Sequence, residues 1–153
     1  LIKALLSFDG KGLKVEQRNG KVYVSMENKL LFKSGSWAVG SEGKQAIKQL
    51  AKVLEQNKDI SVLIEGHTDD DPYIGDSKLS GNWDLSVKRA TAIVSLLLQN
   101  KGVMPENITA AGKGEYSPLV PNSSADNRSK NRRIEVILAP KLDEIGKLLQ
   151  DLD

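Results

Sequence analysis

The stretch "NWDLSVKRATAIVSLLLQ", residues 82–99, decides how this chain is read. Its periodicity predicts a long helix in which Leu85, Ile93 and Leu96 form one apolar stripe. Arg89 lies in the middle of that stripe, midway between Leu85 and Ile93. A guanidinium does not lose its proton in practice, and breaking a buried ion pair costs about 3–5 kcal/mol. We therefore expect Arg89 to meet an anion or a set of carbonyls on the core side of this helix.

In the layout deduced from the predicted elements, the nearest candidate anions are in "GHTDDDP", residues 66–72. They follow "DISVLIEG", residues 59–66, whose alternating pattern predicts a strand. Asp69 opens the loop that leads to the helix of Arg89, so we expect the two charges at the same edge of a sheet. Two interpretations are open at this point. The charges form an internal salt bridge, or they face a ligand that offers an amine to Asp69 and a carboxylate to Arg89.

Outside this region the chain alternates predicted strands and helices. They are a hairpin turning at Asn19-Gly20, a short strand and a Gly/Ser loop at 28–39, a helix at 42–56, a strand entering a turn at 107–115, a loop at 116–131, a strand at 132–139 and a final amphipathic helix at 141–152.

This order of elements contains two strand–helix–strand units between about residues 30 and 139. Such units predict an α+β fold with a mixed sheet and helices packed on one face. Ligands usually bind where strands end and helices begin, which is the end that carries Asp69. We divide the chain into a lead-in and hairpin at 1–29, a central domain at 30–140 and the final helix at 141–153.

Composition excludes several classes of function. The 153 residues carry a net charge of +2, which is too small to argue for bulk binding to nucleic acid or membrane. The absence of cysteine excludes disulfides, thiol catalysis and cysteine metal sites. No apolar run approaches the roughly 20 residues of a membrane-spanning helix. Because the sequence begins at Leu1, we expect it to be a fragment or a processed form.

Other candidate sites have simpler interpretations. His67 with the neighbouring aspartates could hold a metal, but a single histidine in a loop is a poor ligand set, so we expect no metal and no cofactor. The basic run at 127–133 lacks interleaved aromatics, so we expect no nucleic-acid binding. Trp37 and Trp83 could stack on sugars, although packing at the margin of the core is the expectation for Trp83.

Four ordered motifs resemble a known family. "IEGHTDD", "NWDLSVKRA", "AAGKGEYSP" and "NRSKNRRIEVIL" are similar to the successive motifs of the OmpA-like peptidoglycan-binding domain family, over about residues 30–139. This family includes the C-terminal domains of OmpA-type outer-membrane proteins, Pal lipoproteins and flagellar MotB stators. The resemblance implies a βαβαββ-type fold and non-covalent binding of the peptide stems of the cell wall.

The resemblance also implies which residues contact the ligand. In the family, the aspartate of the "HTD" motif and the arginine of the "LSxxRA" motif hold diaminopimelate; here they are Asp69 and Arg89. The further positions that it implies are Thr68, Asn82, the loop from Phe32 to Gly35, and the triplet Asn131, Arg132 and Arg133.

Two features depart from the usual pattern of the family. The loop between the "HTD" and "LSxxRA" motifs, residues 70–81, is longer than in the shorter members and resembles the MotB-like subset. Lys33 stands where many members have an acidic residue.

The function implied is a non-enzymatic tether. It would bind the diaminopimelate of peptidoglycan stems and anchor an envelope protein to the wall. The location implied is the periplasm, with attachment to the outer membrane, or to an inner-membrane stator, through a part that precedes this sequence. The alternatives are a metal-assisted cell-wall hydrolase built on "HTDDD" and a purely structural protein–protein module.

Overall fold

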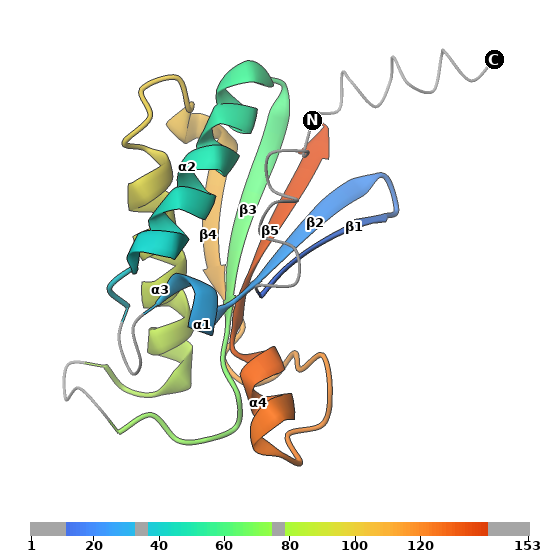
Figure 1. The fold of residues 1–153 in the computed structure, drawn as a ribbon, viewed down its shortest axis with the longest axis vertical. Coiled ribbons are helices and arrows are strands. Elements are labelled where there is room, and N and C mark those ends of the chain that lie inside the picture. The colour runs from blue at the N-terminus through green and yellow to red at the C-terminus, as the bar shows by residue number, and fades with distance from the viewer. Residues whose placement is uncertain (1–11, 33–36, 75–78, 141–153) are drawn as a thin grey trace.

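The computed structural model describes residues 12–32, 37–74 and 79–140. Figure 1 shows a sheet whose strands run side by side, with α2 and α3 together on one side of it. The elements are, in chain order, β1 (Leu13–Arg18), β2 (Lys21–Glu27), α1 (Asn28–Leu31), α2 (Ser41–Gln56), β3 (Ile60–His67), α3 (Asn82–Leu97), the 3-10 turn η2 (Pro105–Asn107), β4 (Ile108–Gly112), α4 (Ala125–Asn131) and β5 (Arg133–Pro140).

The sheet has the strand order β1-β2-β5-β3-β4. β3 and β4 are parallel and are joined through α3, whereas β5 pairs antiparallel with both β2 and β3. β2 also runs parallel to β3 across the intervening β5, so α1 and α2 lie in a second crossover. The predicted α+β class, with a mixed sheet and helices on one face, is confirmed.

The core lies between the sheet and the two long helices. Every second strand residue points to this layer, because side chains alternate between the two faces of a sheet. The apolar faces of α2 and α3, which recur about every 3.6 residues, pack against them. Members that are no more than 3% exposed include Val24, Met26, Ile47, Leu50, Val62, Ile64, Ile93, Leu97, Ile134 and Val136.

Gly66 allows α3 to lie directly on the end of β3. A Cβ atom on Gly66 would lie 2.0 Å from the backbone oxygen of Ser86, which is far inside contact distance. Gly112, opposite Gly66 in the parallel β3–β4 pair, has a similarly close neighbour in the side chain of Ser86. The N-terminal half of α3 is therefore seated on two strands at the edge where β3 leads into the loop of Asp69.

The hairpin predicted at Asn19-Gly20 is confirmed. Both residues have positive φ, 53° and 77°, as a tight turn between twisted strands requires. Arg18 pairs with Lys21 at the closed end, and β2 then pairs with β5 along residues 22–27. The hairpin is thus part of the same sheet as the strands of the central region.

Two segments differ from the sequence prediction. Residues 28–31 form the helical turn α1 instead of a strand, because Leu30, Leu31 and Phe32 are all buried and a strand would turn one of them away. The predicted loop at 116–131 contains α4, which begins after Ser124, whose hydroxyl accepts a hydrogen bond from the Asn127 backbone at 3.1 Å.

The predicted final helix at 141–152 and the lead-in at 1–11 lie outside the described residues. Among the residues that are described, no helix has both the length and the apolarity to cross a membrane.

Candidate functional site

The loop that follows β3 carries Thr68 and Asp69, which are 3% and 5% exposed. The backbone N–H of Thr68 donates to the carbonyl of Gly114 at 2.8 Å, so the loop is tied to the turn that follows β4. The Thr68 hydroxyl donates to the carbonyl of Asp69 at 2.9 Å. The backbone before the aspartate is therefore fixed, and the position of its carboxylate is set by the sheet edge.

Among the described residues, two groups contact the carboxylate of Asp69. Its Oδ1 accepts from the backbone N–H of Asp71 at 3.0 Å, and its Oδ2 is ion-paired with Nη1 of Arg132. From the sequence we expect Asp69 next to Arg89. The ion pair that the structure shows for Asp69 is with Arg132, which immediately precedes β5. An ionised carboxylate has about four acceptor sites, so these two contacts leave capacity for a further donor.

Arg89 is buried, as its place in the apolar stripe predicts. It is 6% exposed, lies on α3 between the buried Leu85 and Ile93, and has its guanidinium over the ring of Phe32 at 5.4 Å from the ring centre. A cation over an aromatic face is an attractive arrangement that strengthens on desolvation. Phe32, which ends the helical turn α1, thus packs against the guanidinium of Arg89.

Burial and the charges of neighbouring residues act on Arg89. Burial lowers the pKa of Arg89 from its ordinary value, and the nearby positive charge of Arg132 lowers it further. Asp69 and Tyr73 act in the opposite direction on the same pKa. One of the two guanidinium groups pairs with the Asp69 carboxylate and the other lies near enough to feel its charge, so these three residues carry an excess of one positive charge. Such an excess favours an anionic group.

Asn82 holds the loop to the start of α3. α3 begins at Asn82 itself, and the cap position is Gly81. The side-chain amide of Asn82 donates to the carbonyls of Asp69 and Asp71, at 3.3 and 2.9 Å. The residue is therefore next to the candidate site, where it fixes the backbone around Asp69.

A second ion pair closes the outer side of the loop. Arg128, on α4, contacts the carboxylates of Asp70 and Asp71 at 3.0 and 3.6 Å from its Nε atom. Sequence analysis missed this contact because it predicted a loop where α4 forms. The capping serine and the lysine and arginine in the last turn of α4 were the available signals.

Asn131 and Arg133 are engaged inside the protein. The side-chain oxygen of Asn131, which is fully buried, accepts from the backbone N–H groups of Leu119 and Val120 at 2.9 and 3.1 Å. Arg133 pairs with Glu135 at 2.7 Å on β5. Its strand neighbour Ile134 points to the helices, so Arg133 points to the opposite face of the sheet. Both residues thus have partners within the fold, and Arg132 lies beside Asp69. The ligand contacts implied for Asn131 and Arg133 stay predictions.

Gly35, the remaining predicted contact, lies outside the described residues, as do Lys33 and residues 75–78 of the long loop. His67 is buried at the end of β3, and its Nε2 atom contacts the carboxylate of Glu65 at 2.8 Å. Within the described part of the chain, no group of three or more His, Asp or Glu side chains is arranged to hold a metal ion.

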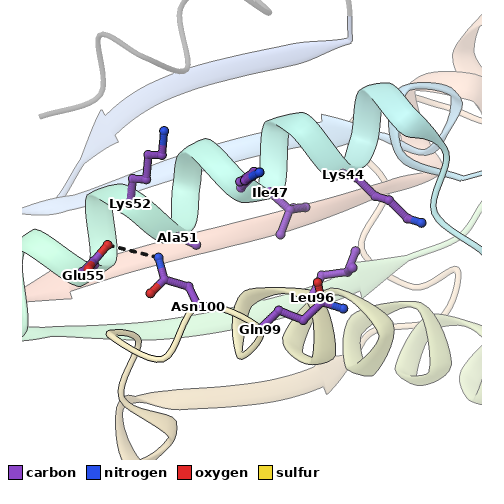
Figure 2. A pocket seen from close by; sticks show the side chains of 9 residues that line it. Lys44, Ile47, Ala51, Lys52, Glu55, Leu96, Gln99 and Asn100 are labelled. Atoms are coloured by element: carbon purple, nitrogen blue, oxygen red, sulfur yellow. Dashed lines mark hydrogen bonds between the residues drawn. The ribbon is translucent and has the colours of Figure 1, made fainter.

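Among the described residues, the two larger cavities lie away from these charges. One, of about 510 Å³, runs between α2 and α3 and is lined by three lysines of α2 spaced one turn apart, Lys44, Lys48 and Lys52. Figure 2 shows Lys44 and Lys52 of this set. This cavity is bounded at one end by a hydrogen bond from Asn100 to Glu55 at 3.2 Å. The other, of about 690 Å³, lies beside the hairpin and Leu119. Neither includes Asp69 or Arg89.

The chain is similar in sequence to one protein family and to several known proteins. A family model described as the OmpA family matches residues 31–132. Motility protein B of Bacillus subtilis (strain 168) is 33% identical over 129 residues, which cover 84% of this chain and 49% of the relative. Motility protein B of Helicobacter pylori (strain ATCC 700392 / 26695) is 28% identical, over 99% of this chain and 59% of the relative. The chain thus spans about half the length of these curated relatives.

Solved structures share the fold over most of the chain. The periplasmic domain of Helicobacter pylori MotB superposes with a TM-score of 0.80 at 27% identity, covering 97% of this chain and 91% of that one. The cell wall anchor of the T6SS from Pseudomonas aeruginosa superposes with a TM-score of 0.81 at 29% identity, covering 92% and 98%.

Proposed function

The chain belongs to the OmpA family, and from that premise we propose that it binds peptidoglycan non-covalently and anchors a larger envelope protein to the cell wall. The relatives support this proposal. One similar structure is named as a cell wall anchor, and another is the periplasmic domain of a motility protein. The periplasm is accordingly the proposed location, with attachment to a membrane through a part of the protein that precedes this sequence.

The observation that carries the proposal is the group of buried charges after β3. Asp69 and Arg89 are 5% and 6% exposed, and Arg132 pairs with the aspartate. A ligand that carries both an ammonium and a carboxylate would match the two signs of this group. The side-chain end of diaminopimelate, the diamino diacid of many peptidoglycan stems, has that pair of groups on one carbon.

Each protein group has a separate role in the proposed complex. The ligand carboxylate meets Arg89, whose burial makes the contact strong because little water competes for it. The ligand ammonium donates to the acceptor sites of Asp69 that Asp71 and Arg132 leave open. Thr68 and Asn82 hold the backbone that presents the carboxylate.

We propose binding without catalysis. A guanidinium does not exchange protons at ordinary pH and therefore cannot serve as a general acid or base. An aspartate that is ion-paired to Arg132 and hydrogen-bonded to the backbone of Asp71 is suited to holding a cation in place. Recognition of a fixed charge pattern is the role that this arrangement supports best.

The test is titration calorimetry with two stem peptides that differ in one group. One carries diaminopimelate, and the other carries lysine, which lacks the terminal carboxylate. We expect the wild type to prefer the diaminopimelate stem by at least about tenfold, since a charge-assisted hydrogen bond contributes about 1.5–3 kcal/mol. Amidation of that carboxylate should remove the same preference because it removes the charge.

Variants of Arg89 and Asp69 test which residue gives the preference for the diaminopimelate stem. Arg89→Met should bind both stems equally and weakly, whereas Asp69→Asn should weaken both stems, which share the ammonium. Lys48→Ala, in the cavity between α2 and α3, is the matched control and should bind as the wild type does. A folded wild type that binds neither stem would refute the proposal. Metal-dependent release of fragments from cell wall would instead favour the hydrolase.

A further inference from the structure

Trp83 and Tyr116 form an exposed aromatic pair beside the candidate site. Their rings stack with centres 5.3 Å apart and planes inclined by 29°, and the residues are 54% and 66% exposed. The expectation that Trp83 packs at the margin of the core is therefore wrong, because more than half of its surface meets solvent. A single exposed aromatic residue needs no explanation, but two stacked rings make a continuous apolar patch.

The protein fixes the position of this pair through backbone contacts. Ser86 links the two elements: its hydroxyl accepts from the Gly114 N–H at 3.0 Å and donates to the Trp83 carbonyl at 2.8 Å. Gly114 also lies against the indole, since a Cβ on it would be 3.3 Å from the ring. The ring of Trp83 is therefore held on one side by the turn that carries Tyr116.

The pair adjoins the residues that position Asp69. Trp83 directly follows Asn82, whose amide donates to the Asp69 carbonyl. On the other side, the Gly114 carbonyl accepts from the backbone of Thr68. The aromatic surface and the charged group therefore share one end of the sheet and one set of backbone anchors.

We propose that the Trp83–Tyr116 pair is a second subsite, which stacks against a sugar ring of the glycan strand. This inference rests on the proposed function, because it assigns a second part of the same polymer. A pyranose ring presents apolar C–H groups on its face and hydroxyls around its edge. An aromatic pair offers the matching apolar face, while the indole N–H and the phenol O–H can bond the hydroxyls.

The spacing of Trp83 and Arg89 along α3 is similar to the length of the stem between its diaminopimelate and its sugar. Trp83 and Arg89 are six residues apart on α3, which corresponds to about 9 Å along the helix axis. In a peptide stem, two residues separate the diaminopimelate from the sugar, and they span up to about 7 Å when extended, before the linking group is added. A stem held at Arg89 can therefore bring its sugar to Trp83.

The experiment compares one stem in two forms, free and attached to its disaccharide. We expect the wild type to bind the disaccharide form more tightly, by about three- to tenfold, the range for one aromatic stacking contact. Trp83→Ala should lose this preference and keep the affinity for the free stem. Trp83→Phe retains an aromatic face and should keep most of the preference. Val87→Ala, one turn along α3 and also exposed, is the control.

Each outcome decides the inference. Equal binding of the two forms by the wild type, or an equal loss for both forms in the Trp83→Ala variant, would overturn the sugar subsite while leaving the stem contact in place. A thermal melt of each variant shows whether it folds. If Trp83→Ala does not fold, the preference of Trp83→Phe for the disaccharide form is compared with that of the wild type instead. Failure of the wild type to bind either form would refute the proposed function itself.

Discussion

Replacing Gly66 by alanine should destabilise the fold by forcing α3 away from β3. A Cβ atom at this position would lie 2.0 Å from the oxygen of Ser86 and 2.8 Å from its carbonyl carbon. Both atoms belong to the backbone of α3, so neither can rotate away. The strand or the helix must move by about 1 Å to restore an ordinary contact, and overpacking of this kind costs about 1–3 kcal/mol in a close-packed interior.

The loss can be measured by urea unfolding and by thermal melts followed by circular dichroism. In a chain of this size, 1 kcal/mol shifts the Tm by about 2–4 °C, so the expected fall is roughly 2–12 °C. Because α3 also carries Asn82 and Arg89, its displacement should weaken binding of the diaminopimelate stem as well. Stability and affinity are therefore expected to fall together in this variant.

Gly102 offers a matched control. A Cβ on Gly102 would lie 2.5 Å from Cγ of Glu55, which is also far inside contact distance but involves a flexible side chain that can move aside. Gly102→Ala should therefore shift the Tm by less than about 2 °C, as surface substitutions usually do. The argument from backbone contact is wrong if Gly66→Ala is as stable as the wild type. It is also wrong if Gly102→Ala loses as much stability as Gly66→Ala.

Two further predictions concern stability. Asn131→Ala leaves the backbone N–H groups of Leu119 and Val120 without their acceptor, and should cost about 2–4 kcal/mol in urea unfolding; a loss below about 1 kcal/mol would contradict the role given to this side chain. The hydrogen bond from His67 lowers the pKa of Glu65, so the stability it contributes is complete above the ordinary pKa of a glutamate and is lost as the pH falls through the lowered value. Glu65→Gln should flatten this acid-side part of the pH–stability curve, and an unchanged curve would count against it.

Elements with strong periodicity were predictable from the sequence. The apolar face of α2 and the alternation in β3 and β5 place core residues at fixed spacings, and the Asn19-Gly20 pair fixes a turn that few other residues could adopt. The short elements were not predictable in this way. α1 comprises four residues, too few to display a helical period, and it takes its shape from the burial of Leu30 and Leu31.

The candidate site was predictable in part. The position of Arg89 in an apolar stripe indicates that it is buried, and burial of a charge implies a partner. The sequence could not say which carboxylate, which second cation or which ring surrounds it. Asp69 pairs with Arg132, which is 63 residues away along the chain, and the ring beside Arg89 belongs to Phe32. These neighbours depend on the order of the strands.

Residue spacing is enough to predict the periodic elements, the α+β class and the presence of a buried cation, because each of these follows from a local pattern. The tertiary structure alone decided which charges meet, that Asn131 and Arg133 have partners within the fold, and that Trp83 and Tyr116 share an exposed surface. The physical reason is that β5 lies between β2 and β3 in the sheet. That placement brings Arg132 to Asp69, and the parallel pairing of β3 with β4 brings the turn of Tyr116 to the start of α3.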